Sequence, residues 1–563
     1  MHRTLTTLLS AILVWTAVLA GPKRTIRIES QTEFDALQER IESAVARGDH
    51  DITVLFGPGC YHFAQNHLKL YGKSWDGISL TLQGDGSVFT AAGQEVHSGD
   101  KLEVAFQPGW HFLSPDGSAL PMAGKALRSS GLVRIEDAAS RLCRIRSPRP
   151  LSLPAGDGRD CYIQLSRWYE SRTYPVSKIE DGWIYFTATD LERVSPLGYN
   201  VNQDFLYGRM MPRFRLINAG DDPAAVLCRA GRIRLPEGTE SAHCCTTTTF
   251  LHIHDTQIRS LTLSGLRFQG NADLEGLHLI GIYHCRSERI EIRDCQFSQI
   301  GSSVFAAEFT DHLRFVGNRF ARCGKHVLST SATCRDARFL ENRFDDCGWD
   351  WGPWTCITAA GDAYRISGNQ FHNFGYAGIF VGDARPLPDG RQAGGEVEDN
   401  VLWYDGDFLA QAGQHTMMDS GAIYVNTAND RAVIRRNYIH DIGGVKDNRG
   451  IFCDDGARNF EITGNVILHI ANSYAIDARR VSETDDDPFP RNTGNRIEGN
   501  LVDAPIRFEG NETSDRCILG ANAFLTKEGR SATPALHVRH ISRQEKQNTL
   551  TTIRDTEWEA IVK

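Results

Sequence analysis

The sequence lacks the cysteine patterns of metal sites and of disulfide-rich scaffolds. Its 14 cysteines include no C-x-x-C pair and no His-Cys metal spacing, and they are too dilute in 563 residues for a disulfide framework. Cys323 and Cys347 hold equivalent places in consecutive repeats and are expected to stack within disulfide range. We favour buried, reduced cysteines over a disulfide, despite the oxidising compartment inferred below.

The sequence also lacks apolar runs long enough for a membrane span, except near its start. Residues 1–20 have a basic beginning at His2 and Arg3, an apolar run over residues 8–19 and a small-residue pattern at residues 18–20. This combination is typical of a secretory signal peptide and is too short for a confident anchor. We therefore predict that the mature protein is secreted or periplasmic.

Acidic residues outnumber basic residues in this sequence. The formal net charge is -9, and it becomes -10 when Arg3 leaves with the signal peptide. A negative chain argues against nucleic acid and against an anionic membrane surface, so a neutral partner is favoured. With 41% apolar residues the chain is globular and can form a large core or several domains. The sequence gives no indication of the oligomeric state.

One short phrase is abundant between residues 261 and 524: an apolar residue, two variable residues, Asn, one variable residue and another apolar residue. Two degenerate copies, with Leu266 and Cys295 in the Asn position, precede seven full copies. Successive positions lie 23–37 residues apart, and no sustained helical stripe occurs between them. The Asn positions are Asn318, Asn342, Asn369, Asn400, Asn437, Asn465 and Asn500.

This repeat predicts an all-β solenoid, a parallel β-helix in which stacked coils pair about 4.8 Å apart. Stacking gives each Asn a neighbour of its own kind, so its amide can satisfy the turn backbone and the next Asn at a buried corner. We interpret this ladder as structural, not catalytic.

Three further segments accompany the repeat region. We assign residues 21–94 to an N-terminal cap and the first coils, with a capping helix over residues 32–47. Phe34, Leu37, Ile41 and Val45 lie on one face of that helix, and Ser30 or Thr32 can cap it. Residues 95–250 read as a β-rich insert domain, residues 251–524 as the β-helix with an active-site cleft, and residues 525–563 as a C-terminal tail without a clear pattern.

A second strand follows each Asn phrase. Aligning these strands on Ile or Val points Ile423 and Ile451 inward, because side chains alternate between faces. An exposed aromatic stripe is unusual, and sugar rings stacking on it would explain it; the alternative is that loops cover it as a second core. We predict that Phe380, Tyr424, Phe452 and Asp477 bind substrate. The outward row in this register is Tyr283, Phe305, Thr358, Phe380, Tyr424, Phe452 and Asp477.

Asp454 and Asp455 lie near the end of this row. In this register Asp477 is one coil on and two residues back from Asp454, and two carboxylates so placed can serve as acid and base. Arg479 lies directly above Asp454, so an ordinary surface ion pair is the competing interpretation. We predict that Asp454 and Asp455 are catalytic and that Arg479 contacts substrate.

Asp419, in D-S-G-A-I-Y, is the third predicted catalytic residue. The strand register alone places it far along from Asp454, so it joins the site only if the excursion over residues 404–420 folds back. Further excursions emerge around these coils at residues 383–396, 443–449 and 479–494, and solenoid insertions usually build the binding face.

Three other residues complete the predicted binding face. Trp351 belongs to a tryptophan cluster over residues 348–354, which suits saccharide binding although one or two of these rings are expected to pack. Arg449 and His440 lie in and beside an excursion and can contact a sugar. Together with Lys446 and Tyr424 they can also supply the base of a lyase.

Three segments resemble a known superfamily: D-S-G-A-I-Y, the following N-Y-I-H-D-I-G, and G-I-F-C-D-D-G-A-R-N. Together with the Asn phrases they are similar to the right-handed parallel β-helix carbohydrate-active enzymes of the pectin-lyase-like fold. Within it they most resemble the glycoside hydrolases, including the xylosidase-like and fucosidase-like branches. The resemblance covers roughly residues 250–510. It implies exo-acting or debranching hydrolysis of a poly- or oligosaccharide, with Asp419 and Asp454 or Asp455 as the acidic residues.

Two other functions compete with hydrolysis. A β-helix polysaccharide lyase would abstract a proton beside a uronate, often with calcium neutralising the carboxylate. A non-catalytic glycan-binding solenoid or adhesin would keep the aromatic face without turnover. The basic and His-Gly motifs of polygalacturonases are not evident. We expect a hydrolase that needs no cofactor, with calcium only if the enzyme is a lyase.

Overall fold

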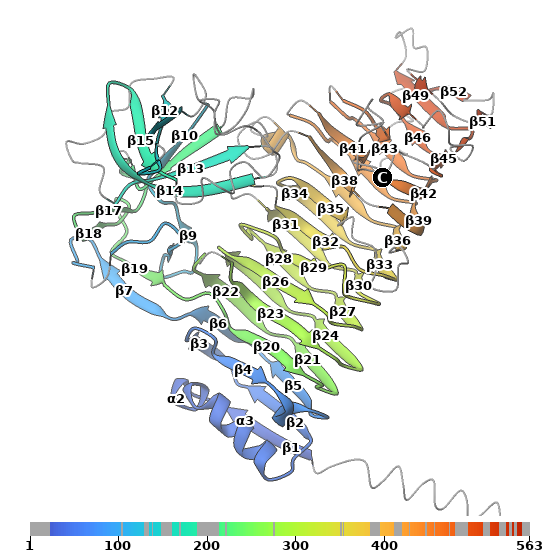
Figure 1. Ribbon diagram of the computed structural model, residues 1–563. Coiled ribbons are helices and arrows are strands. Elements are labelled where there is room, and N and C mark those ends of the chain that lie inside the picture. The colour runs from blue at the N-terminus through green and yellow to red at the C-terminus, as the bar shows by residue number, and fades with distance from the viewer. Residues whose placement is uncertain are drawn as a thin grey trace, which may run out of the picture.

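The computed structural model describes the following residues: 23–102, 105–128, 134–137, 139–147, 160–167, 170–188, 213–219, 222–273, 276–348, 352, 354–382, 394–409, 419–426, 428–444, 447–454, 457–471, 473–478, 494–509, 518–527, 536–539, 543–544 and 549–553. Three long parallel sheets wrap around one core along most of this chain (Figure 1). The predicted signal peptide lies outside the described residues.

The first sheet carries the strands that precede the Asn phrases. Its described strands, in order of pairing, number 14. They are β1 (Lys23–Ile28), β2 (Asp51–Phe56), β5 (Ser79–Gly84), β21 (Ser260–Ser264), β24 (Arg289–Arg293), β27 (Leu313–Val316), β30 (Arg338–Leu340), β33 (Tyr364–Ser367), β36 (Gly395–Glu398), β39 (Ala428–Arg435), β42 (Arg458–Thr463), β45 (Arg496–Glu498), β48 (Ile518–Leu519) and β51 (Arg543–Gln544).

The second sheet carries the strands that follow the Asn phrases. Its 13 described strands are β3 (Gly59–Phe63), β6 (Ser87–Ala91), β22 (Arg267–Asn271), β25 (Gln296–Ile300), β28 (Arg319–Ala321), β31 (Arg343–Cys347), β34 (Gln370–Phe374), β37 (Val401–Trp403), β40 (Tyr438–His440), β43 (Val466–Leu468), β46 (Leu501–Val502), β49 (Ala523–Lys527) and β52 (Thr549–Ile553).

The third sheet carries the candidate site. Its 12 described strands are β4 (Leu68–Tyr71), β20 (Leu251–Thr256), β23 (His278–Cys285), β26 (Ser303–Glu308), β29 (Leu328–Thr330), β32 (Thr355–Ala359), β35 (Ala377–Gly382), β38 (Ser420–Asn426), β41 (Asn448–Cys453), β44 (Ile476–Ala478), β47 (Ile506–Glu509) and β50 (Leu536–Arg539). The coils therefore continue past residue 524, where the sequence repeat ends, because β50, β51 and β52 extend all three sheets.

The predicted Asn ladder is confirmed. Each Asn donates from Nδ2 to Oδ1 of the Asn one coil on, at 2.9–3.0 Å from Asn318 through Asn500, and the same Oδ1 also accepts from the preceding Asn backbone N–H. Asn522, which the sequence analysis did not include, ends the ladder. The ladder satisfies polar groups that are fully buried at this corner.

The residue before each ladder Asn bends the chain from the first sheet into the second. It has a positive φ before every ladder Asn from Asn318 to Asn500, including the non-glycine residues Glu341 (57°) and Arg436 (54°), but not before Asn522; Gly265 (66°) and Asp294 (55°), which precede Leu266 and Cys295, share this conformation. A left-handed residue turns the strand sharply, and Gly adopts this conformation without a Cβ penalty. The sequence phrase therefore encodes both the turn and the amide that satisfies it.

A ladder Asn in the middle is expected to matter more than one at the beginning. Asn437→Ala removes the acceptor of the Asn400 N–H and Nδ2 and the donor to Asn465, so we expect a loss of about 3 kcal/mol in the free energy of unfolding. The coil before Asn318 has Cys295 in the Asn position, so Asn318 accepts only the backbone N–H of Cys295 and no side-chain amide from that coil. Asn318→Ala is therefore expected to lower the free energy of unfolding by less. Chemical denaturation of both variants tests this order; equal losses would contradict it.

The predicted capping helix is confirmed, although it is broken once. Helices α2 (Gln31–Asp35) and α3 (Leu37–Ala46) lie at the end of the solenoid beside β1 (Figure 1), and a 3₁₀ turn, η1 (Lys73–Trp75), follows β4. The Ser30 hydroxyl accepts from the Glu33 N–H and caps α2. Phe34, Leu37 and Ile41 are fully buried in the solenoid core, so they close its first coil.

An antiparallel unit interrupts the coils between β6 and β20. Its largest sheet has seven described strands, β10 (Gly124–Arg128), β16 (Arg213–Ile217), β13 (Tyr162–Arg167), β14 (Glu170–Glu180), β15 (Trp183–Thr187), β12 (Leu142–Arg146) and β11 (Arg134–Asp137). Smaller sheets join it to the solenoid: β7 (Gly93–His97), β19 (Ser241–Cys245), β8 (His111–Leu113) and β9 (Ala119–Leu120), and the pair β17 (Leu227–Arg229) and β18 (Arg232–Arg234).

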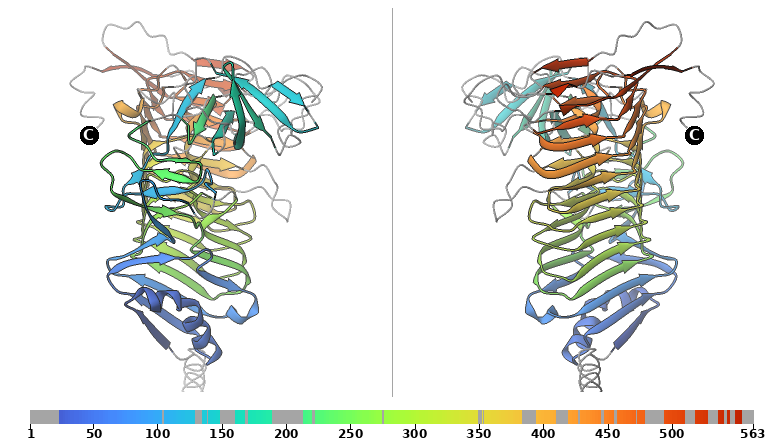
Figure 2. Two further views of the ribbon diagram at one scale, coloured as in Figure 1. Left: turned by 90° about the vertical axis from the view of Figure 1, so that its left-hand side faces the viewer. Right: turned by 90° about the vertical axis from the view of Figure 1, so that its right-hand side faces the viewer.

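This insert unit leaves the solenoid at the corner between the second and third sheets. Residues 404–419, which connect β37 of the second sheet to β38 of the third, belong to the same corner. Both views in Figure 2 place the insert unit on one side of the coils, and its seven-stranded sheet has its own buried core. The insert therefore emerges from the corner that also carries the candidate site.

Candidate active site

Strands β26, β32, β38 and β41 of the third sheet each have two successive buried residues near their beginning. Val304 and Phe305, Cys356 and Ile357, Ala422 and Ile423, and Gly450 and Ile451 all lie inside the solenoid. A corner interrupts the strict alternation of side chains that holds within a strand. The predicted outward position of Phe305 is therefore wrong: Phe305 pairs with Ile280 and Leu328 in the core, and Ala306 occupies the outward row.

The outward row is otherwise as predicted from β32 onward. Thr358, Phe380, Tyr424, Phe452 and Asp477 occupy equivalent positions in successive coils. Ile423 and Ile451 point into the core, which confirms the predicted register at this place. Arg507 continues the row one coil beyond Asp477.

The aromatic part of this row is not an exposed platform. Phe452 is fully buried, Tyr424 is 5% exposed and Phe380 is half-buried, and they form a small apolar cluster with Tyr376. The rings of Tyr424 and Phe452 stack on each other at 4.9 Å, so their faces are occupied. The prediction of an exposed stripe is wrong, and the alternative of a second, covered core describes these rings.

Arg449 is the centre of the charged cluster beside these rings. Its side chain is completely buried, its Nε donates to Asp477 Oδ2 at 2.5 Å, and its Nη1 donates to Asp419 Oδ1 at 3.2 Å. Its guanidinium carbon lies 3.8 Å from the centre of the Phe452 ring. A buried guanidinium needs this carboxylate partnership, and the ring adds a cation–π contact.

Asp477 is held by two arginines. Arg507 donates to it from Nε at 2.6 Å and from Nη2 at 2.5 Å, in addition to the bond from Arg449. The hydrogen bonds to Asp477 raise the pKa of Arg507, although burial of Arg507 acts in the opposite direction as the largest single influence. Asp477 is fully buried, so its place in the structure is between two cations.

Asp454 lies on the other side of the aromatic cluster. It is 4% exposed, and the Tyr424 hydroxyl donates to its Oδ2 at 3.0 Å. Its backbone N–H donates to the Val425 carbonyl, which fixes it at the end of β41. The phenol therefore orients one oxygen of this carboxylate.

Tyr376 connects the two sides. Its hydroxyl donates to the Asp419 carbonyl at 2.9 Å. Burial raises the pKa of Tyr376 well above its usual value; a hydrogen bond with Tyr424 lowers it, and the charges of Asp419 and Asp454 raise it again. Tyr376 is therefore a neutral phenol close to both carboxylates.

Asp419 reaches this cluster from the corner that precedes β38. Its backbone has a positive φ of 61°, and its side chain keeps 29% of its surface exposed. The sequence analysis left open whether the excursion folds back toward the Asp pair, and the contacts with Arg449 and Tyr376 show that Asp419 lies beside them. It is the most accessible acid of the cluster formed by Asp419, Asp454 and Asp477.

The remaining predicted residues divide into two groups. Asp455, Arg479 and Trp351 lie outside the described residues, as does Lys446. His440 is on β40 in the second sheet, where its Nδ1 bonds to Asp441 at 2.6 Å and its ring stacks on Tyr438. The structure therefore does not bring His440 to the Arg449 cluster.

The sequence analysis missed Arg507 and Tyr376. Arg507 follows Asp477 in the outward row, so the alternation I-R-F-E at residues 506–509 contained its signal. Tyr376 precedes A-G-I-F at a corner, where the alternation of side chains along a strand carries no information. Both residues contact predicted site residues by hydrogen bonds.

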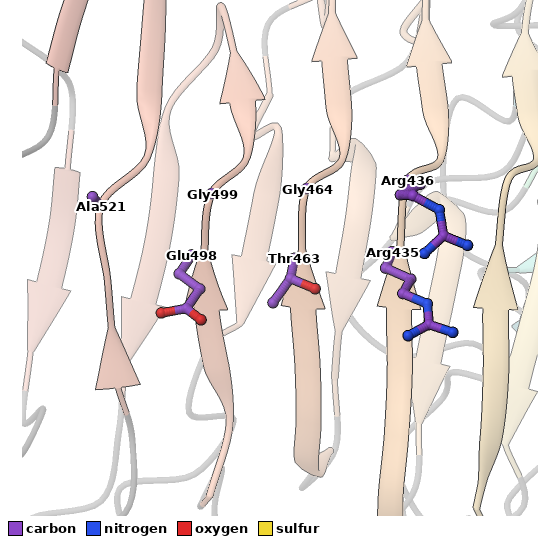
Figure 3. A pocket seen from close by; sticks show the side chains of 7 residues that line it. All are labelled: Arg435, Arg436, Thr463, Gly464, Glu498, Gly499 and Ala521. Atoms are coloured by element: carbon purple, nitrogen blue, oxygen red, sulfur yellow. The ribbon is translucent and has the colours of Figure 1, made fainter.

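A surface hollow lies away from this cluster, at the Asn corner. Arg435, Arg436, Thr463, Gly464, Glu498, Gly499 and Ala521 line it (Figure 3). Arg435 and Arg436 pair with the buried Glu398, and Glu498 pairs with Arg496. These charges are matched within the fold, so we do not assign the site to this hollow.

Two observations concern metals and membranes. No group of three His, Cys, Asp or Glu side chains within the described ranges is arranged to hold a metal ion. None of the helices in that part of the chain has the length and apolar content of a membrane span.

Comparison with known proteins agrees with this architecture. A family profile described as a right-handed β-helix region matches residues 245–388. A solved structure described as a glycoside hydrolase is 10% identical, with 94% of this chain and 96% of that chain covered and a TM-score of 0.57. The protein has the right-handed parallel β-helix fold. This was the predicted fold class, and at such low identity the structural likeness concerns the fold alone.

Two further solved structures cover nearly the whole chain with lower scores. The A-module of Azotobacter vinelandii mannuronan C-5 epimerase AlgE4 is 10% identical, with 94% of this chain and 100% of that chain covered and a TM-score of 0.41. The family 28 exopolygalacturonase of Yersinia enterocolitica is also 10% identical, with 95% and 78% covered and a TM-score of 0.31. No curated protein matches the sequence.

Proposed function

We propose that this β-helix protein is a secreted glycoside hydrolase that cleaves a poly- or oligosaccharide through Asp419 and Asp454. The observation that carries the proposal is the pair of carboxylates around Tyr376, one oriented by Arg449 and the other by Tyr424. Hydrolysis of a glycosidic bond needs one carboxyl group that gives a proton to the leaving oxygen and one that activates water or attacks carbon. The resemblance of D-S-G-A-I-Y and G-I-F-C-D-D to hydrolase segments supports the same residues.

Asp477 receives a different role in this proposal. Its oxygens accept three hydrogen bonds from two guanidinium groups, and water does not reach it. It therefore positions Arg449, which in turn positions Asp419. Asp455 is adjacent to Asp454 in sequence and stays a candidate acid.

The contacts also favour hydrolysis over elimination. A lyase needs a base that is free to take a proton beside a uronate. Arg449 is bound to Asp477 and Asp419, and His440 lies on another sheet beside Asp441. The Tyr424 hydroxyl donates a hydrogen bond to Asp454 Oδ2. The lyase is the second candidate, with Lys446 as its base.

A panel of polysaccharides separates these functions. The full-length protein is incubated with each glycan while both reducing ends and the ultraviolet absorbance of unsaturated uronates are recorded. The proposal expects reducing ends without the ultraviolet signal. An unsaturated product would replace it with the lyase, and binding without any product would favour the glycan-binding solenoid.

The pH and metal dependence give an independent test. One acid must hold its proton and one base must be ionised, so the rate of a carboxylate-pair hydrolase is expected to fall on both the acidic and alkaline sides of an acidic to neutral optimum. We expect EDTA to leave the rate unchanged and Lys446→Ala to stay active. Calcium dependence with an alkaline optimum would contradict the proposal.

A further inference from the structure

Trp354, Tyr376, Asp419 and Arg449 lie in successive coils and are linked to one another by hydrogen bonds. The Tyr376 N–H donates to the Trp354 carbonyl at 3.1 Å, the Tyr376 hydroxyl donates to the Asp419 carbonyl, and the Asp419 carboxylate accepts from Arg449. Each step crosses one coil at the corner before the third sheet. Because coils stack about 4.8 Å apart, Trp354 lies about 10 Å from the level of Asp419 along the solenoid axis.

Trp354 is surrounded by polar side chains. It is half-buried; the Lys325 Nζ lies 5.2 Å from the centre of its ring, and the His326 ring meets it edge-on at 5.0 Å. Lys325 pairs with Asp273 at 2.7 Å, and each of these two side chains is 19% exposed. The charge of Lys325 is therefore balanced by Asp273.

One neutral histidine, His326, contacts this ring, and a second, His278, lies close enough to Lys325 and His326 to interact with their charges. Burial lowers the pKa of His278 to about 4, with Lys325 and His252 adding to the shift. Burial likewise lowers the pKa of His326 to about 4, with His278 and Lys325 adding to it. The His278 Nδ1 is buried and has no hydrogen-bond partner among the described residues, so it is a polar group without a protein partner there.

The insert unit contacts the solenoid next to Lys325, at Asp273. The Asp273 N–H donates to the Gly109 carbonyl at 2.7 Å, and Gly109 lies just before β8 of the insert. An aromatic ring, neutral imidazoles and a balanced ion pair suit a ligand with apolar ring faces and uncharged hydroxyl groups. A neutral sugar has both features.

We infer that Trp354, Lys325, His326 and His278 form a saccharide-binding subsite that holds a neutral sugar unit about two coils from the Asp419–Asp454 pair. The inference deepens the proposed hydrolase function and rests on it. The saccharide chain would run along the solenoid axis, with its cleaved bond at Asp419 and a more distant unit at Trp354. The subsite serves binding of longer chains and has no part in bond cleavage.

Affinity electrophoresis tests the subsite without turnover. The Asp454→Asn protein, alone and combined with Trp354→Ala, is run in gels that contain xylan, arabinan or galactan as neutral probes. We expect at least one polysaccharide to retard the Asp454→Asn protein and Trp354→Ala to weaken that binding about tenfold. Trp354→Phe is expected to retain part of the binding. No retardation in any gel, or equal retardation of both proteins, would overturn the inference.

A matched control separates the subsite from a general loss of aromatic packing. Trp403 is also half-buried and adjoins histidines, with its ring stacked on His372 and His440, but it lies on the second sheet. Trp403→Ala is expected to leave binding unchanged.

Kinetics give a second test. On aryl monosaccharide substrates, Trp354→Ala should keep kcat, whereas KM for long chains should rise. If kcat on these short substrates fell as well, Trp354 would have a structural role and not a binding role. The activity of the Asp454→Asn protein tests the hydrolase proposal separately from the binding test of the subsite.

Discussion

Asp454→Asn is expected to lower kcat by about a thousandfold while leaving the melting temperature nearly unchanged. The amide keeps the shape of the side chain and can still accept from the Tyr424 hydroxyl, but it cannot exchange a proton or carry a negative charge. Because the change affects the reaction and not the contact, substrate affinity should survive. Steady-state kinetics on the glycan identified by the panel, together with thermal unfolding, measure both quantities.

A second acid-to-amide change provides the control. Asp503 is a partly buried carboxylate on the second sheet, where it accepts twice from the His469 N–H at 2.8 and 2.9 Å. Burial raises the pKa of Asp503, so it also has an unusual environment. Asp503→Asn is nevertheless expected to leave kcat unchanged. Full activity of Asp454→Asn would remove Asp454 from the mechanism and leave Asp419 and Asp455 to be tested.

The solenoid was predictable because its chemistry repeats. The coils from Asn318 to Asn500 each place one buried amide after a left-handed residue, and both features are visible locally in the sequence around these ladder residues. The inward positions of Ile423 and Ile451 followed from alternation alone. Asn522 was overlooked although L-G-A-N-A-F at residues 519–524 matches the phrase in full, so the sequence contained its signal.

The corners were not predictable by the same means. Alternation assumes a continuous strand, whereas two successive residues point inward at the entrance to the third sheet. Phe305 was therefore assigned to the wrong face, and the contribution of Tyr376 was invisible. Asp419 also lies at a corner, so only the resemblance to hydrolase segments drew attention to it.

The burial of the aromatic row could not be predicted from the sequences of the strands that contain these rings. The sequence shows that Tyr424 and Phe452 point away from the solenoid core, but whether they meet water depends on the rest of the chain around them. The insert unit has the same difficulty, because its antiparallel strands pair over long sequence separations, as β10 does with β16. Such pairing leaves no periodic signal.

Arg449→Ala is expected to lower the free energy of unfolding by about 3–5 kcal/mol, because it breaks a fully buried ion pair from one side. Asp477 would keep only Arg507 as a cationic partner, and Asp419 would lose the guanidinium that orients it. The contact of the guanidinium with the Phe452 ring would also be lost. Chemical denaturation measures the change, and the activity of whatever protein folds is expected to fall as well, since Asp419 is no longer held.

Two further variants show whether burial is the cause. Arg343 pairs with Asp345 at 2.7 Å, with side chains 50% and 29% exposed, so Arg343→Ala is expected to cost less than about 1 kcal/mol. Replacing both partners of the buried pair, in Arg449→Met/Asp477→Leu, removes the two fully buried charges, although Arg507, which is 20% exposed, then loses its carboxylate partner, so only part of the loss should be recovered. Activity should not return with stability, because Asp419 still lacks its guanidinium. If Arg449→Ala were as stable as the unmodified protein, the buried ion pairs would not hold this end of the third sheet together.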